Sequence, residues 1–372
     1  MKRHHITAII LLLAAAAICV YAGGLFLSLR EPDVIKPGEG VTEVRKLSDY
    51  FAPLKGTRGD TDIYVLKGEG DGGRVLVLGG THANEPSGYL AAVVLVEKAK
   101  VTAGELFVIP RANNSAFTHN DSQEGAPLYL HLTNPAGEER AFRYGSRATN
   151  VIDQWPDPDV YEHASSGQQL SGSETRNLNR GYPGRADGNL TEQMCYAITE
   201  MIKKEDIGLT FDLHEASPEY PVIHATVAHE KAMDIAAIGS FELDMLGIAM
   251  ALEPSPVNLR GLTHRELGDY TDTYPLLMET ANASQGRLRG ATNEKLALDG
   301  KDKFYVAAEK LGMLYVPYDE NGHSIEERVG RHLQGILSYT TAYSDFSGNV
   351  VTIENVPGYE EVMASTVGNF LN

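Results

Sequence analysis

The sequence has few cysteines. Its 372 residues include two, and Cys19 lies in an apolar N-terminal stretch, so the globular part keeps Cys195 alone. An internal disulfide and a CxxC-type metal or redox site are therefore excluded from that part. Cys195 stands in a helix-like stretch between Met194 and Tyr196, and we interpret it as a core residue rather than a nucleophile.

Basic residues are also scarce. The chain carries 32 Lys and Arg against 50 Asp and Glu, which gives a formal net charge of -18. Nucleic acids are bound through a basic surface that releases counterions, so no nucleic acid is expected as a partner. Low-complexity tracts and internal repeats are lacking too. With 42% hydrophobic residues, the chain can bury the core of one large domain.

The longest hydrophobic stretch lies at the N-terminus. Lys2 and Arg3 precede the 24 uncharged residues 6–29, and Arg30 follows them. This length can cross a bilayer, so we expect residues 1–30 to be an uncleaved membrane anchor. A cleaved signal peptide is the alternative, because the residues up to Ala22 loosely fit a cleavage site. By the positive-inside rule, the rest of the chain is expected on the extracytoplasmic (periplasmic) side, anchored or secreted.

Segments typical of strands and helices alternate after the N-terminal region. Strands are predicted by short apolar stretches at 74–78, 105–109, 207–213, 274–278 and 313–316. Helices are predicted at 86–98, where Pro86 occupies the start, and at 190–204 and 325–337. The alternation indicates an α/β fold with a mixed, largely parallel central sheet and helices on both faces.

Composition divides the chain further. Residues 31–60 hold Pro and Gly among charges and are interpreted as a linker or lead-in. The main domain is predicted to cover 61–345, with a long polar excursion at 118–175. Residues 346–372 are a C-terminal extension whose structure the pattern does not predict.

Side chains that bind metals follow three of the predicted strands. His82 comes just after the first strand, and Glu85 opens the helix behind it. His214 and Glu279 each follow directly on an apolar strand. Ligands of open α/β sheets bind at the carboxyl ends of the strands, so these four side chains are expected to converge at one edge.

The residue types suit hydrolysis by a single zinc ion. Two His and one Glu form a three-ligand catalytic zinc set, here His82, Glu85 and His214, with a fourth position left for water. A nitrogen and oxygen ligand set favours zinc over other divalent ions. Zinc lowers the pKa of the water and polarises a carbonyl. A separate carboxylate must take the proton of the water, and Glu279 suits that role.

Four motifs in this order resemble the zinc carboxypeptidase superfamily, in its succinylglutamate desuccinylase/aspartoacylase branch. They are Gly79-Gly-Thr-His-Ala-Asn-Glu85, Asn177-Leu-Asn-Arg180, Asp212-Leu-His214 and Glu279. The match runs from about residue 74 to 280, and is most similar to a membrane-anchored bacterial subgroup of unknown substrate. The resemblance implies a zinc carboxypeptidase-like fold and a substrate, small molecule or peptide, with a free carboxylate.

The resemblance also implies roles for polar residues outside the metal set. Asn179 and Arg180 would hold the free carboxylate of the substrate, for which the planar fork of an arginine is suited. A further arginine should stabilise the oxyanion, and Arg111, Arg147 and Arg176 are candidates. Chain order favours Arg147 or Arg176 as the catalytic arginine.

One position departs from the family pattern. The family usually has Asp where this chain has Asn177, and that Asp orients a zinc-bound histidine. An amide oxygen accepts the same hydrogen bond but adds no charge to the ligand. Metal affinity or rate is then altered, or Asp212 takes over the role.

Three nearby residues are given no role in the metal site. Glu215 follows His214 and, by strand alternation, is expected to point away from it. His224 and His229 follow an apolar segment and are interpreted as non-ligands.

Residues close to Glu279 could shape a substrate pocket. The stretch 259–274 is a candidate loop over the site, with His264 or Tyr270 touching substrate. Arg287 and Arg289 either line a pocket for an acidic substrate or neutralise nearby carboxylates.

Three functions remain open at this point. The first is deacylation of an N-acyl amino acid by cleavage of an amide bond next to a free carboxylate. The second is a metallocarboxypeptidase acting on peptides, including cell-wall peptides. The third is a catalytically inactive binding protein on the same fold, against which the complete set of ligands and base argues.

Overall fold

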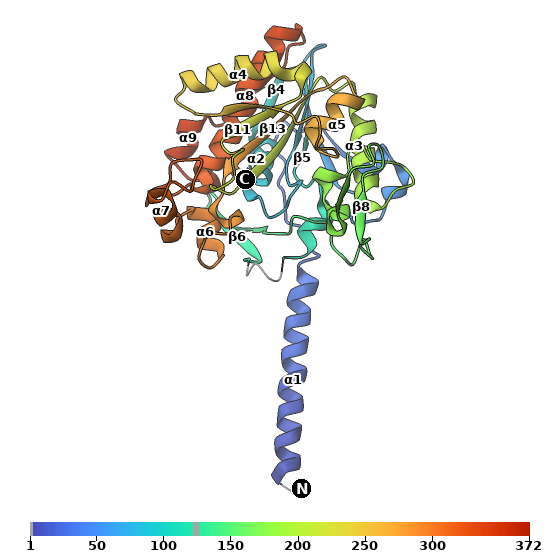
Figure 1. The fold of residues 1–372 in the computed structure, drawn as a ribbon, viewed down its shortest axis with the longest axis vertical. Coiled ribbons are helices and arrows are strands. Elements are labelled where there is room, and N and C mark those ends of the chain that lie inside the picture. Colours follow the sequence, from blue (N-terminus) through green and yellow to red (C-terminus); the bar gives the residue numbers. More distant parts are fainter. Residues whose placement is uncertain (1–2, 122–125) are drawn as a thin grey trace.

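The N-terminal helix stands apart from the rest of the protein. The computed structural model describes residues 3–121 and 126–372, so Lys2 and residues 122–125 of the polar excursion lie outside it. Helix α1 (Arg3–Ser28) extends as a single rod away from the other elements (Figure 1), and none of its residues is buried. In the described part of the chain, it is the one helix long and apolar enough to cross a membrane or serve as a signal sequence.

A sheet of eight strands forms the centre of the remaining chain. Its order is β1-β2-β5-β3-β10-β13-β11-β12. The strands are β1 (Glu43–Lys46), β2 (Asp62–Lys67), β3 (Arg74–Leu78), β5 (Glu105–Ile109), β10 (Leu209–Ala216), β11 (Ala225–Ala228), β12 (Ala251–Pro254) and β13 (Tyr274–Ala281). The central strands β5, β3, β10 and β13 run parallel, whereas β2 and β11 pair antiparallel with the outer two of them. The predicted mixed, largely parallel sheet is confirmed.

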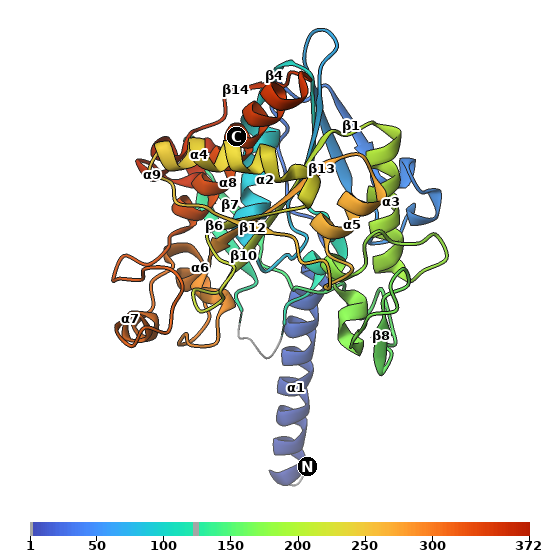
Figure 2. The same ribbon diagram turned by 45° about the horizontal axis from the view of Figure 1, so that its top comes forward.

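Helices cover both faces of this sheet, as predicted (Figures 1 and 2). They are α2 (Pro86–Lys98), α3 (Leu190–Lys204), α4 (Met233–Met245), α5 (Thr263–Tyr270), α6 (Glu294–Asp299), α7 (Lys303–Lys310), α8 (Ile325–Ser347) and α9 (Tyr359–Met363). Side chains alternate across each strand, so Val75 and Val77 of β3 pack with α2 and α8. Leu76 and Leu78 pack with α3 on the opposite face.

Segments outside the predicted domain core also form strands. The lead-in supplies β1, which pairs antiparallel with β2, and β14 (Thr352–Glu354) of the C-terminal extension pairs with β4 (Lys100–Ala103). The polar excursion forms two separate hairpins, β6 (Tyr129–Thr133) with β7 (Glu139–Arg143) and β8 (Val160–Glu162) with β9 (Gln169–Ser171). It therefore lies outside the central sheet, as expected.

Some predicted elements differ from the structure. Strands β10 and β13 continue past the predicted ends at residues 213 and 278, so His214 and Glu279 lie inside them. Residues 313–316 form no strand, and the side chains of Leu314 and Val316 pack into small apolar clusters. Helix α8 continues well beyond residue 337, because its apolar side chains go on packing against the sheet and α4 as far as Tyr343.

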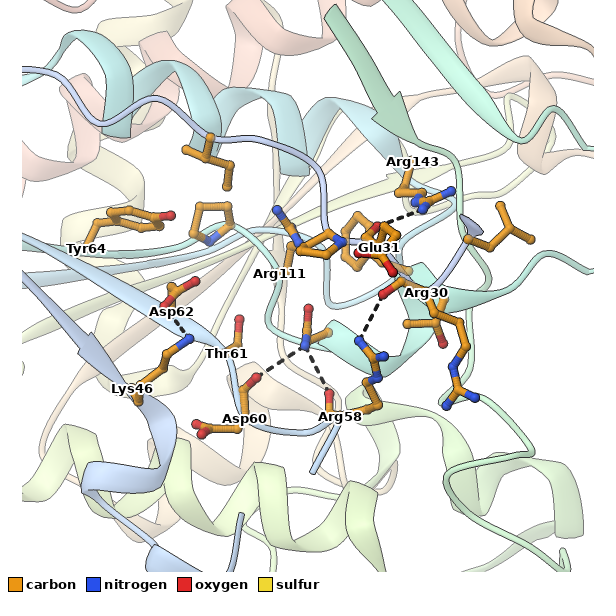
Figure 3. Close-up of a pocket in the computed structure, with 17 residues that line it drawn as sticks. Arg30, Glu31, Lys46, Arg58, Asp60, Thr61, Asp62, Tyr64, Arg111 and Arg143 are labelled. Atoms are coloured by element: carbon orange, nitrogen blue, oxygen red, sulfur yellow. Dashed lines mark hydrogen bonds and ion pairs between the residues drawn. The ribbon is translucent and has the colours of Figure 1, made fainter. Parts of the chain in front are cut away.

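Arginines of the globular part hold the connector that follows α1. Arg58, Arg111 and Arg143 donate hydrogen bonds to backbone carbonyls within residues 28–33. Figure 3 shows those from Arg58 to Arg30 and from Arg143 to Glu31. Hydrogen bonds from a charged donor are stronger than neutral ones, so these contacts fix the direction in which α1 leaves the domain. Arg111 serves the connector and does not line the cavity of the predicted zinc site, which removes it from the candidates for the oxyanion.

Candidate metal and catalytic site

Three parallel strands bring the predicted site residues together. Strand β3 ends in a turn in which Gly80 has a φ of +62°, and a Cβ there would lie 2.6 Å from the ring of Phe117. This glycine turn leads the chain directly to His82. On the neighbouring strands, His214 of β10 and Glu279 of β13 are register partners. The convergence expected from the strand ends is therefore present.

The three predicted ligands form a compact buried group. Nδ1 of His82 lies 2.8 Å from Oε1 of Glu85, and Nδ1 of His214 lies 3.0 Å from Oε2 of the same carboxylate. Ligand atoms of the three residues all lie within 4.8 Å of one another. All three side chains are buried, so bulk water does not hydrate the imidazole nitrogens and carboxylate oxygens that face one another.

The outer nitrogens of both imidazoles face acceptors. Nε2 of His82 lies 2.9 Å from the amide oxygen of Asn177, which can only accept, so this nitrogen carries the proton. Nε2 of His214 lies 2.9 Å from Oδ2 of Asp212. Nδ1 of His82 is thereby left to present a lone pair to Glu85, and Nδ1 of His214 faces the other oxygen of the same carboxylate. This is the arrangement in which metal-binding histidines donate their other ring N–H to a supporting acceptor.

The electrostatics of the group favour a cation. Burial and the charge of Arg147 lower the pKa of His82 to about 4, so its ring is neutral near pH 7. Burial acts against charge on His214, but Asp212 and Glu85 outweigh it and raise the pKa of that ring. The two histidines likewise hold the pKa of Glu85 well below its usual range despite burial. The donor set and its charge therefore fit a divalent ion such as zinc.

Glu279 lies beside this group without joining it. Its side chain is partly exposed to the cavity, and its buried Oε2 has no hydrogen-bond partner among the described residues. Burial raises the pKa of Glu279 to about 8, with His214 acting against the shift and Glu85 adding to it. A carboxylate with a raised pKa is a stronger base, which suits proton transfer.

His82, Glu85 and His214 line a cavity of about 490 Å³. Its lining includes the predicted His82, Glu85, Arg147, Asn179, Arg180, His214, His264 and Glu279. It also includes apolar residues from β11, β13 and the loops around β12 and α5, among them Val227, Pro254, Leu259 and Leu277. A cavity with an apolar wall and a few convergent polar groups is typical of a small-molecule site.

The arginines predicted for the site separate into two groups. Nη1 of Arg147 lies 3.2 Å from Oε1 of Glu85 and 3.4 Å from Nδ1 of His82, directly at the ligand group. Arg176 instead forms a bidentate pair with Asp157, at 2.7 and 3.0 Å, and does not line the cavity. The guanidinium of Arg176 holds the polar excursion in this structure, and a catalytic role for Arg176 stays a prediction.

Asn179 and Arg180 both reach the cavity. The amide oxygen of Asn179 accepts hydrogen bonds from the backbone N and hydroxyl of Thr263, at 2.8 and 3.0 Å, so its Nδ2 is the group left to meet a ligand. Burial and the nearby charge of Arg147 lower the pKa of Arg180. Two guanidinium groups facing one cavity make it attractive to an anion.

Strand alternation places Glu215 as predicted. Its carboxylate accepts hydrogen bonds from Arg328 and from Asn282 on the face opposite His214. The stretch 259–274 is different from the predicted loop, because part of it is helix α5.

Residues around Glu279 divide between lining the cavity and lying outside it. His264 lines the cavity, whereas Tyr270, Arg287 and Arg289 do not. Tyr220 and Gln285 also line it and had no predicted role. They occupy loops that follow β10 and β13, and no spacing rule marks a loop residue in advance.

Comparison with known proteins gives distant structural neighbours. No family model and no curated protein matches the chain. Among solved structures, a succinylglutamate desuccinylase from Silicibacter sp. TM1040 is 16% identical with a TM-score of 0.40, covering 69% of this chain and 66% of that one. Cell shape determinant protein Csd4 from Helicobacter pylori is 11% identical with a TM-score of 0.46, covering 82% of this chain and 59% of that one.

These neighbours include the branch that the sequence motifs resemble. A further one is a succinylglutamate desuccinylase/aspartoacylase from Rhodobacter sphaeroides, 16% identical with a TM-score of 0.35, covering 59% of this chain and 51% of that one.

Proposed function

We propose that this protein is a zinc-dependent hydrolase that cleaves an amide bond next to a free carboxylate. The observation that carries the proposal is the arrangement of His82, Glu85 and His214, whose two Nδ1 atoms face one buried carboxylate. Asn177 and Asp212 face the outer nitrogens, so the two Nδ1 atoms are the ring nitrogens directed at that carboxylate.

The residues around that carboxylate have different roles in hydrolysis. A bound zinc ion would lower the pKa of a water and polarise the scissile carbonyl. Glu279 accepts the proton of the water and passes it to the leaving nitrogen. A cation close to Glu279 favours its ionised form, which is the form a base needs. Arg147 stabilises the charge that develops on the carbonyl oxygen.

Arg180 and Asn179 select the substrate. Their side chains line the same cavity as the metal residues, where Arg180 can bind a carboxylate through two parallel hydrogen bonds. The substrate class is therefore an N-acyl amino acid, which presents an amide and a free carboxylate close together.

A peptide substrate is the second candidate, and the size of the cavity favours it. Besides the metal residues, the lining of the cavity of about 490 Å³ includes Pro254, Pro256 and Leu259, and this volume leaves room for more than a short acyl group. A chain cleaved at its C-terminal residue would place that residue at Arg180 and extend along this apolar wall. Csd4, one of the structural neighbours, has been seen bound to a tripeptide.

The setting of the site is also part of the proposal. We place α1 in a membrane as an uncleaved anchor, with the catalytic domain on the extracytoplasmic side. Its length and apolar composition support this, as does its complete exposure in the structure.

The full chain in detergent tests the proposal. Bound zinc is measured, and hydrolysis is assayed on N-acyl amino acids and on short peptides with free C-termini, with and without a chelator. Glu279→Gln is the active-site variant, and Glu253→Gln, which removes a carboxylate from β12 on the same cavity, is its control.

The expected result is zinc-dependent turnover that Glu279→Gln reduces by a factor of about 10² to 10⁴ and Glu253→Gln leaves nearly unchanged. The preferred panel then separates deacylase from peptidase. Stoichiometric zinc without turnover on either panel would favour an inactive binding protein instead, and the absence of zinc after reconstitution would overturn the metal site itself.

A further inference from the structure

We propose a second metal site, formed by His224, His323 and Glu327, that holds a divalent transition-metal ion such as zinc at the junction of β11 and α8. It is separate from the proposed catalytic site and does not depend on it. Its ligand atoms all lie within 4.8 Å of one another, the same compactness as in the first group.

The hydrogen bonding of His323 leaves the lone pair of its Nδ1 atom facing another acceptor. Nε2 of His323 lies 3.0 Å from the carbonyl oxygen of Pro317, which can only accept, so Nε2 carries the proton. In the neutral ring, Nδ1 then presents a lone pair to Oε2 of Glu327, 2.8 Å away. Two acceptors at this distance need a cation or an extra proton between them.

His224 points a further nitrogen at the same carboxylate. Its Nε2 is buried and has no hydrogen-bond partner among the described residues, and it lies 3.8 Å from Oε1 of Glu327. The residue itself is 8% exposed. A buried nitrogen without a partner is costly unless a ligand satisfies it.

The surroundings support the carboxylate in the way metal sites do. Nε of Arg331 lies 3.1 Å from Oε1 of Glu327, which leaves Oε2, the atom nearest His323, to bind a metal. Supporting hydrogen bonds to the second oxygen of a ligating carboxylate are a regular feature of such sites. Two imidazoles and one carboxylate form a donor set that suits zinc, with water at a fourth position.

The site lies on the face of the sheet covered by α8, away from the catalytic cavity. Thr226 of β11 contacts Tyr339 of α8, and Thr280 of β13 contacts His332, so these side chains define that face. His224 comes directly before β11 and meets the first turns of α8 there. An ion bound at this point would tie the edge of the sheet to the long helix and stabilise the fold.

The sequence conceals this site because its residues are far apart in the chain. The interpretation of His224 as a non-ligand rests on the apolar segment before it, which contains no information about distant residues. The pair His323 and Glu327 has the spacing of one helical turn, which is common in surface ion pairs. Only the packing of α8 against β11 adds the third ligand.

Metal counting on the full chain in detergent tests the proposal. The protein is stripped with a chelator, reconstituted with zinc, freed of excess ion, and analysed for zinc per chain and for its unfolding temperature. His224→Asn removes the imidazole, and asparagine tolerates the positive φ of 44° found at this position. His323→Gln is the second variant. His131→Gln is the matched control, because His131 forms an exposed 2.8 Å pair with Glu294 to which no described residue adds a third ligand.

The wild-type chain and His131→Gln should bind two zinc ions per chain. His224→Asn and His323→Gln should each bind one and lose the part of the thermal stabilisation by zinc that this site provides. His82→Ala should also keep one ion, held at the second site, which distinguishes this proposal from the proposed catalytic function. One ion per chain in the wild type that disappears in His82→Ala would overturn it. In that case His323 and Glu327 form an ion pair through a proton.

Discussion

The amide oxygen of Asn177 lies 2.9 Å from Nε2 of His82, while the amide nitrogen of the same residue lies 2.7 Å from Oε2 of Glu174. Glu174 thus decides which way the amide faces, because its carboxylate can only accept. The family motif has an aspartate where this chain has Asn177. Here a carboxylate is still present nearby, but it belongs to Glu174 and contacts the amide of Asn177 instead of His82.

This relationship predicts how the ligand can be strengthened. Asn177→Asp alone should lower the unfolding temperature, because it brings two carboxylates within hydrogen-bonding distance. In the combination of Asn177→Asp with Glu174→Gln, the amide of the new glutamine can donate to the new aspartate. The negative charge of that aspartate then lies beside His82. The double variant should bind zinc about 10-fold more tightly. Competition with a chromophoric chelator measures this, with Glu174→Gln as the control, and equal affinities in both would contradict the prediction.

Arg147 and Arg176 should respond differently to the same substitution. Arg147→Ala removes a guanidinium at the metal group and should lower kcat by a factor of about 10² to 10³. Arg176→Ala should leave kcat almost unchanged but lower the unfolding temperature, because Asp157 loses its bidentate partner. Steady-state kinetics and thermal unfolding of the two variants check this. A large loss of kcat in Arg176→Ala alone would reverse the assignment.

The carboxylate clamp makes a prediction about KM. Arg180→Ala should raise KM for a good substrate by a factor of about 30, the equivalent of about 2 kcal/mol for hydrogen bonds to a charged group. A substrate whose free carboxylate is converted to an amide should lose affinity in the wild type but little more in the variant. If the two losses simply add, Arg180 does not contact that carboxylate.

His264 should make stability depend on pH. Burial lowers its pKa to about 3, while the ring in the unfolded chain keeps a pKa of about 6.5. Between these two pKa values, the ring is protonated in the unfolded chain and neutral in the folded protein. Its contribution is therefore unchanged above pH 6.5, and stability is lost as the pH falls below it, by about 3 kcal/mol at pH 4.

Denaturant unfolding of the metal-free protein at pH 7 and at pH 4 measures this loss. His264→Asn keeps a polar partner for Ser255, which contacts the ring at 2.8 Å, but has no proton to gain. It should lose less stability between the two pH values than the wild type. Equal losses would mean that His264 is protonated in the folded state.

Much of the fold and of the metal group could be predicted from local patterns. Apolar stretches of the right length predict β3, β5, β10 and β13, and parallel strands end at the same edge of a sheet. A residue that follows such a strand is therefore located without further information. His82 and Glu85 follow β3, whereas His214 and Glu279 lie near the carboxyl ends of β10 and β13, and the structure brings all four together.

Residues that act from loops or through packing could not be placed in the same way. Arg147 and Arg176 both lie in or next to the polar excursion, and only the tertiary structure shows that one faces Glu85 and the other Asp157. Loop direction depends on contacts with distant segments, which a local pattern does not contain.

The sequence by itself determined the order of the strands along the chain, the metal-type residues at their ends and the apolar N-terminal segment. The tertiary structure decided which arginine reaches the cavity, how Glu174 orients Asn177, and that His224 meets His323 and Glu327. The physical reason is the separation along the chain of the residues that determine each feature. Strand and helix periodicity is set by neighbouring residues, whereas a contact between β11 and α8 exists only after both have packed on the same face of the sheet.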